Sequence, residues 1–167
     1  GVTLTRQEAK AAVKTYRTAY PDVPQFWEDL DHAARYCIET KQPITVNGKF
    51  TFRMKGPCML IDLPSGRSLC YIRPAIERRT ITYEDIDTGE TRRREVMAVT
   101  YEGKNQTTTK WERIATHAGK ITENIVQAIA RDVLAEGIRN VYNELPDLDM
   151  CLHVHDELGG ETNPDPV

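Results

Sequence analysis

Several features that would assign this chain to a common class are missing from its sequence. It has no run of about 18 apolar residues, the length that a membrane-spanning helix needs, and residues 1–20 hold no apolar signal-peptide core. Its four cysteines are far apart and form no C-x-x-C pair, so nothing indicates a zinc knuckle or a redox motif. We expect a soluble intracellular protein with reduced, mostly packed thiols.

An excess of positive charge is also missing. The 22 Lys and Arg residues against 25 Asp and Glu residues give a formal net charge of -3, whereas strong phosphate binders are usually basic. Any nucleic-acid site must therefore depend on positive charges gathered in one part of the surface. For the basic run Arg92–Arg94, a solvated strand edge is favoured over a phosphate contact. The length of 167 residues and the 40% hydrophobic content are enough to bury the core of one domain.

The first 43 residues have the pattern of two helices. Residues 5–8, Thr-Arg-Gln-Glu, have the form of a capping box, and apolar residues at helical spacing continue from there to Pro21. A second apolar stripe at helical spacing begins after Asp22, a suitable N-cap, and ends at the break in residues 41–43. Two helices with so short a connection predict a helical hairpin.

Residues 44–110 change to short strand-like pieces separated by turn signals. Asn47-Gly48, between two such pieces, is a strong signal for a type I′ hairpin. Further along, residues 79–83 are predicted to pair with residues 96–101 across the next turn. The segment as a whole predicts a meander of antiparallel hairpins.

The helical period returns after Trp111. Apolar residues recur at helical spacing as far as Leu145. A helix from about Thr122 to Asn143 would span about 30 Å. The turn signal in residues 146–149 then leads into a strand.

That strand carries His153-Val154-His155-Asp156-Glu157, with two histidines and two carboxylates in five residues. A strand alternates its side chains, which would place His153, His155 and Glu157 on one face. The residues alone leave three interpretations open. They are a surface turn, because Gly-Gly follows; a zinc site, weakened because H-x-H supplies only two ligands; and a Mg²⁺ site with Asp156 as ligand and Glu157 in support.

Residues 151–158, Cys-Leu-His-Val-His-Asp-Glu-Leu, resemble motif C of the family A DNA polymerases, where a His-Asp-Glu triplet lies at a β-hairpin turn of the palm. Other stretches are similar to phage and prophage members of that family in the same order: 16–27, 63–71, 111–113, 119–120 and 123–132. The resemblance covers nearly the whole chain.

The fold that this resemblance implies is α+β and covers part of a polymerase. It comprises a helical fingers-derived segment at residues 1–43, a β-hairpin segment at 44–110 and a palm segment at 111–167. In the palm segment a long helix packs on the motif C hairpin.

The activity that the resemblance implies is template-directed DNA synthesis by two metal ions, with Mg²⁺ as cofactor. Asp156 matches the metal-ligating aspartate of motif C and Glu157 the acidic residue beside it, so both are catalytic candidates. Primer-template DNA and dNTPs are the implied partners, in phage or prophage replication. The implied location is the cytoplasm of a bacterial host cell, away from the membrane.

Several residues become candidates for DNA binding through the same resemblance. His155 matches a residue beside the primer terminus, and Gln127 matches a glutamine that contacts the minor groove, where every correct base pair presents acceptors. Asn124 and Arg131 lie at i-3 and i+4 from Gln127 and can share its helix face. Arg67 is a candidate contact to the DNA backbone, because a guanidinium suits phosphate geometry.

The sequence contains no match to the upstream Asp-Tyr-Ser motif of that family or to its nucleotide-binding fingers helix. We therefore expect the isolated chain to be inactive as a polymerase, with sheet edges that can self-associate. Two alternatives stay open. One is a non-catalytic nucleic-acid-binding or accessory module, and the other is a metal-dependent hydrolase built on His153, His155 and Asp156.

Overall fold

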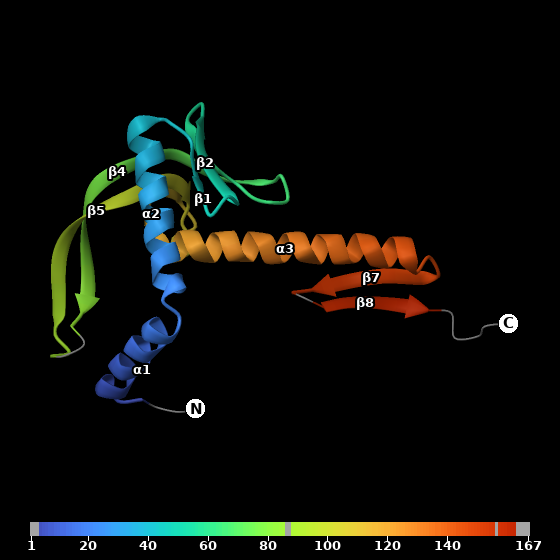
Figure 1. Ribbon diagram of the computed structural model, residues 1–167, viewed down its shortest axis with the longest axis horizontal. Coiled ribbons are helices and arrows are strands. Elements are labelled where there is room, and N and C mark those ends of the chain that lie inside the picture. The colour runs from blue at the N-terminus through green and yellow to red at the C-terminus, as the bar shows by residue number, and fades with distance from the viewer. Residues whose placement is uncertain (1–3, 86–87, 156, 163–167) are drawn as a thin grey trace. The chain divides into compact units, whose positions relative to one another are not determined.

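The computed structural model describes residues 4–85, 88–155 and 157–162, which form three helices and eight strands (Figure 1). The chain divides into two compact units, Gly1–Asn124 and Ile125–Val167. The first unit contains the start of α3 (Ala118–Glu144) and the elements α1 (Arg6–Ala19), α2 (Asp22–Thr40), β1 (Ile44–Val46), β2 (Phe50–Lys55), β3 (Cys58–Asp62), β4 (Ser68–Glu84), β5 (Thr91–Lys104) and β6 (Trp111–Thr116). The second contains the rest of α3 with β7 (Leu148–Val154) and β8 (Glu157–Thr162). No helix in the described ranges is long and apolar enough to cross a membrane.

Helix α1 begins at the predicted capping box. The Thr5 hydroxyl accepts a hydrogen bond from the Glu8 amide at 3.3 Å, and the Glu8 carboxylate accepts one from the Thr5 amide at 2.8 Å. These reciprocal bonds satisfy amide donors that have no partner inside the helix. The prediction for residues 5–8 is therefore confirmed.

The packed helical hairpin predicted for the same region is not formed. Pro21 already has helical backbone angles, φ -64° and ψ -26°, so Tyr20 alone departs from helical geometry between the two helices. So short a connection does not turn the chain enough for α1 to fold back along α2, and Figure 1 shows α1 leading into the start of α2. No residue of α1 is buried.

The six strands of the first unit form one antiparallel sheet in the order β1-β2-β3-β4-β5-β6, which confirms the predicted meander. Asn47 and Gly48 have φ of 51° and 65°, the left-handed values that a type I′ turn requires.

The pairing register predicted for the β4–β5 hairpin is wrong. Residues 79–83 pair with residues 92–96, because β4 and β5 are longer than the local pattern indicates.

The Arg92–Arg94 run lies exposed in β5, in a stretch that pairs with β4 but not with β6. Arg92 forms ion pairs with Asp85 at 3.0 Å and Glu90 at 3.5 Å. The Arg94 guanidinium lies 5.5 Å from the centre of the Tyr83 ring. These contacts agree with the strand-edge interpretation of the run.

The core of the first unit lies between α2 and the sheet. Phe52, Met59 and Ile61 are fully buried on the sheet. The helix that packs on the sheet is α2, which contacts β1, β2 and β4 and buries the apolar stripe Leu30, Ala33, Ala34, Cys37 and Ile38. All four cysteines are free, but Cys70 and Cys151 are exposed, so the expectation of mostly packed thiols is wrong for these two.

An ion pair joins β2 to β3 beside this core. Arg53 donates two hydrogen bonds to the Asp62 carboxylate, at 2.5 and 3.0 Å, and the Ser68 hydroxyl donates a third at 2.6 Å. The Arg53 guanidinium, more than any other group, holds the pKa of Asp62 below its usual value. The pair helps to fix the register of these strands.

Candidate nucleic-acid interface

The histidine-rich motif forms the turn of the β7–β8 hairpin. Val154 pairs with Glu157, and His155 is the first of the two residues between them. His155 has a φ of 53°, and a left-handed first residue is typical of two-residue hairpin turns. The hairpin turn implied by the resemblance is therefore present at His155.

The turn corrects the predicted facing of the side chains. Residues paired across antiparallel strands share a face, so Glu157 lies with Val154 and His153 lies with Leu158. His153 and Glu157 are consequently on opposite faces, because the chain reverses at residue 155 and the alternation does not continue through it. The following Gly-Gly is also part of β8 and not of a turn.

Gly160 allows the two strands of this hairpin to approach each other. A Cβ atom there would lie 2.9 Å from Leu148 Cδ1 and 3.2 Å from the Asp149 carbonyl oxygen. A side chain would therefore force a shift of Leu148. Glycine within a strand often marks such a close approach.

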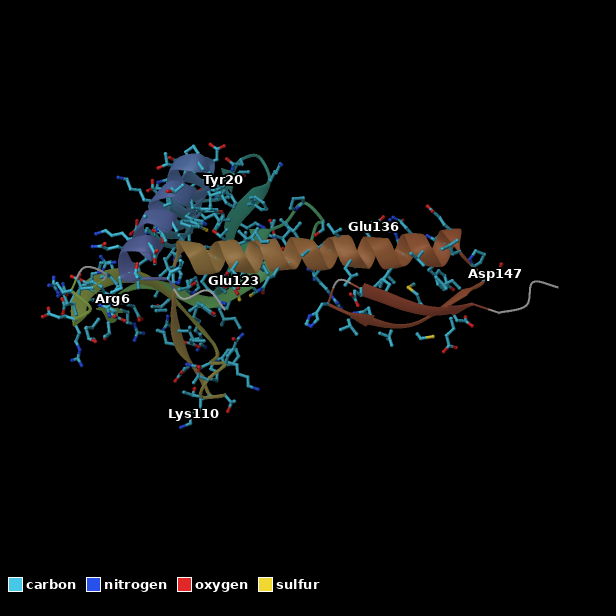
Figure 2. The ribbon with its side chains drawn as sticks, turned by 90° about the horizontal axis from the view of Figure 1, so that it is seen from below. Arg6, Tyr20, Lys110, Glu123, Glu136 and Asp147 are labelled. Carbon is cyan, nitrogen blue, oxygen red and sulfur yellow. The ribbon has the colours of Figure 1, made fainter. Side chains whose placement is uncertain are left out.

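The hairpin lies alongside the part of α3 that belongs to the second unit, as Figure 2 shows between Glu136 and Asp147. A pocket of about 340 Å³ is lined by His155 from the turn and by one face of α3: Gln127, Ala130, Arg131 and Leu134. These helix positions follow the spacing i, i+3, i+4, i+7, which places them on a single face.

The pocket brings together three of the predicted DNA-binding residues, His155, Gln127 and Arg131. The guanidinium and the amide donate hydrogen bonds, and the amide also accepts them. Such groups suit phosphate oxygens and the acceptors on base edges. The sequence interpretation missed Leu134, although its position seven residues after Gln127 could have revealed it.

Asn124 has a partner within the first unit. Its side-chain amide donates a hydrogen bond of 2.9 Å to the Tyr71 hydroxyl. Tyr71 is 3% exposed, and its ring packs edge-on against that of Tyr101, with 5.0 Å between the ring centres. Burial raises the pKa of the Tyr71 phenol. Asn124 thus joins the start of α3 to β4, and its contact with DNA stays a prediction.

Arg67 is exposed in the turn between β3 and β4 and does not line the pocket. A main-chain hydrogen bond closes this turn, because the Leu63 amide donates to the Arg67 carbonyl at 2.8 Å. The DNA contact proposed for Arg67 also stays a prediction.

The expected metal ligand, Asp156, lies outside the described residues. Glu157 is exposed on β8. Within the described ranges, no group of three or more His, Cys, Asp or Glu side chains could hold a metal ion. The described donors therefore do not form a Mg²⁺ site by themselves.

The comparison with curated proteins points to one class, the DNA polymerases of bacteriophages. The chain is similar to the DNA polymerase of Bacillus phage SP02, with 36% identity over 154 residues. The match covers 92% of this chain and 22% of the phage protein, so the chain spans about a fifth of that relative's length. No protein-family model and no solved structure matches the chain.

Proposed function

We propose that this chain is the part of a family A phage DNA polymerase that holds the primer-template duplex next to the catalytic centre. The observation that carries the proposal is the similarity to a phage DNA polymerase along 92% of the chain. The gathering of His155, Gln127 and Arg131 around one pocket supports it independently. The longer protein would catalyse DNA-directed DNA synthesis in phage or prophage replication.

In this proposal the α3 face contacts the duplex. The Gln127 amide donates to the minor-groove acceptors that all correct base pairs share, so it senses pair geometry without sensing sequence. Arg131, one turn further along α3, binds a backbone phosphate. His155 at the hairpin turn lies beside the primer terminus.

Asp156 is the proposed metal ligand of the longer protein, together with carboxylates supplied from outside this chain. Bound Mg²⁺ would favour loss of the primer 3′-hydroxyl proton and stabilise the departing pyrophosphate. A single carboxylate leaves Mg²⁺ mostly hydrated. We therefore expect weak Mg²⁺ binding and no primer extension by the 167-residue chain.

Duplex binding by this chain tests the proposed contact surface. We expect the double variant Gln127→Ala/Arg131→Ala to bind a fluorescent primer-template about tenfold more weakly than wild type, because a phosphate contact and a minor-groove contact are both lost. Fluorescence anisotropy at fixed salt measures the affinity.

Arg139→Ala is the matched control, because Arg139 is on the same helix, forms an ion pair with Glu136 at 2.7 Å and does not line the pocket. Its affinity should stay at the wild-type value. The proposal would be contradicted if the double variant and the control lost affinity for the primer-template equally, or if the isolated chain extended a primer.

A further inference from the structure

Two of the free cysteines lie next to each other on the sheet of the first unit. Cys58 begins β3 and Cys70 is the third residue of β4, and these strands are antiparallel neighbours. Cys58 pairs with Ile72 and Cys70 pairs with Leu60, so the two cysteines are diagonal neighbours, offset by two residues. Paired positions share a face, and so do positions two apart on a strand. Both thiols therefore project from the same face of the sheet.

The main-chain hydrogen bonds of this hairpin favour close approach of the two side chains. The Arg73 amide donates to the Pro57 carbonyl at 2.7 Å, which marks the pair one step before Cys58 as hydrogen-bonded. Hydrogen-bonded and non-hydrogen-bonded pairs alternate along an antiparallel ladder, and side chains are closer in the second kind. The pairs that contain Cys58 and Cys70 are both of the second kind.

An ion from solvent can reach the two thiols. Met59 and Tyr71, which pair between them in the ladder, are buried on the opposite face, whereas Cys70 is exposed and Cys58 is half-buried. Desolvation of the Cys70 sulfur raises the pKa of its thiol, and a hydrogen bond with the Cys58 thiol raises it further. The two sulfurs are therefore in contact with each other on an open face.

A cation lies beside the pair. Lys55 is exposed and pairs directly with Cys58 across the β2–β3 hairpin, and directly paired residues share a face. Two thiolates around a monovalent metal ion carry one net negative charge. The Lys55 ammonium can offset that charge.

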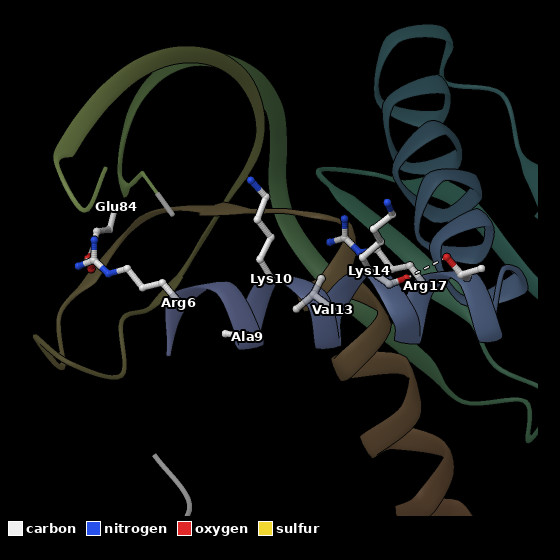
Figure 3. Close-up of a pocket in the computed structure, with 8 residues that line it drawn as sticks. Arg6, Ala9, Lys10, Val13, Lys14, Arg17 and Glu84 are labelled. Carbon is white, nitrogen blue, oxygen red and sulfur yellow. Dashed lines mark hydrogen bonds and ion pairs between the residues drawn. The ribbon is translucent and has the colours of Figure 1, made fainter. Parts of the chain in front are cut away.

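The pocket on α1 offers no such ligands. Its volume is about 670 Å³, and its charged lining is Arg6, Lys10, Lys14, Arg17 and Glu84. Figure 3 shows Lys10 and Lys14 extending from the same side of the helix. Four cations beside one carboxylate repel a metal ion, so the thiol pair is the better metal site of the two.

We propose that Cys58 and Cys70 together bind a soft monovalent metal ion of the Cu⁺ type. Binding replaces the two S–H bonds by two metal–sulfur bonds and releases two protons, with no change of oxidation state. Thiolate sulfur selects soft ions. Cu⁺ is stable with two ligands, whereas Zn²⁺ takes four in its structural sites. The bound ion joins β3 to β4, and the site does not depend on the proposed function.

The offset between the two cysteines favours a metal bridge over a disulfide. Diagonal positions on neighbouring strands are about 7 to 8 Å apart. A disulfide usually needs about 4.4 to 6.8 Å between its Cα atoms. A metal ion between the sulfurs spans the longer distance without a shift of the backbone.

Competition with the chromogenic chelator bathocuproine disulfonate, under anaerobic and reducing conditions, tests the site. We expect the chain to take up one equivalent of Cu⁺. Cys58→Ser and Cys70→Ser should each lower the affinity at least about 100-fold, because one remaining sulfur cannot chelate the ion. Cys151→Ser removes an exposed thiol from β7 and is the matched control, with the affinity expected at the wild-type value.

The unfolding temperature provides a second readout. Saturation with Cu⁺ should raise it by about 3 °C or more in the wild type and in Cys151→Ser, because the paired thiols exist only in the folded chain. The shift should be absent in Cys70→Ser. Circular dichroism should confirm that each variant keeps its secondary structure, and the exposed Cys70 position decides the case if Cys58→Ser folds poorly.

Three results would overturn the inference. One is a loss of Cu⁺ affinity in Cys151→Ser as large as that in Cys70→Ser. Another is wild-type Cu⁺ affinity in folded Cys70→Ser. The third is displacement of Cu⁺ by Zn²⁺ at equal concentration, which would show that the site is not selective for soft ions.

Discussion

Replacement of Asp156 by alanine in the proposed longer polymerase is expected to lower primer extension by at least about 10³-fold. Its similarity to the motif C aspartate makes Asp156 the proposed metal-holding carboxylate. A catalytic metal ion supplies several kcal/mol of transition-state stabilisation, and each 1.36 kcal/mol is a factor of ten in rate. Single-turnover extension of a labelled primer measures the loss.

The affinity for primer-template DNA should be nearly unchanged in the same variant, since the proposed duplex contacts are on α3 and at His155. Glu161→Ala removes an exposed carboxylate from β8 and serves as the control, with extension expected at the wild-type rate. Extension by Asp156→Ala within tenfold of wild type would place the catalytic carboxylate elsewhere.

Arg113→Ala is expected to lower the free energy of unfolding by about 2 kcal/mol. The Arg113 guanidinium on β6 donates to the Arg73 carbonyl at 3.0 Å and to the Thr100 hydroxyl at 3.2 Å. It also forms ion pairs with Glu102 at 3.2 Å and Glu77 at 3.5 Å. Its removal takes one cation from two partly buried carboxylates, of which Glu102 keeps an ion pair with Arg73 at 3.1 Å and Glu77 keeps one with Arg79 at 2.9 Å. Urea denaturation measures the change.

Arg78→Ala is the comparison for this effect. Arg78 is 74% exposed and its ion pair with Glu95 is 3.4 Å long, so solvent screening should limit its contribution to about 0.5 kcal/mol or less. Arg113→Lys keeps the charge but cannot reproduce the forked hydrogen bonds, and should recover only part of the loss. Equal effects of Arg78→Ala and Arg113→Ala would show that the network adds nothing to an ordinary surface ion pair.

Elements with a strong local signal could be predicted from the sequence. The capping box at residues 5–8 and the left-handed pair Asn47-Gly48 are both present. The long helix was also predicted, although α3 begins at Ala118, four residues before the expected Thr122. The apolar stripe starts only at Ile121, so periodicity could not locate the first turn.

Features that depend on partners distant in sequence could not be predicted. The six residues of β6 form a strand because they pair with residues 99–104, and too few of them are buried to show an alternating pattern. The β4–β5 register is likewise set by the whole length of both strands. The bond between Asn124 and Tyr71 joins residues 53 positions apart, which no local pattern indicates.

The candidate site was predicted in part. The resemblance to polymerases pointed to His155, Gln127 and Arg131, and the pocket does bring these three side chains together. The strand alternation used for His153 and Glu157 failed, because a turn between them depends on pairing that the residues alone do not specify.

Chemical-shift mapping tests whether the second unit contacts the primer-template, as proposed. The ¹⁵N-labelled chain would be titrated with a short primer-template duplex while its amide resonances are followed. We expect the largest shifts at the amides of Gln127, Arg131 and His155, with the buried core around Phe52 unchanged. Duplex binding that leaves those three amides unmoved and shifts Arg92–Arg94 instead would contradict the proposal.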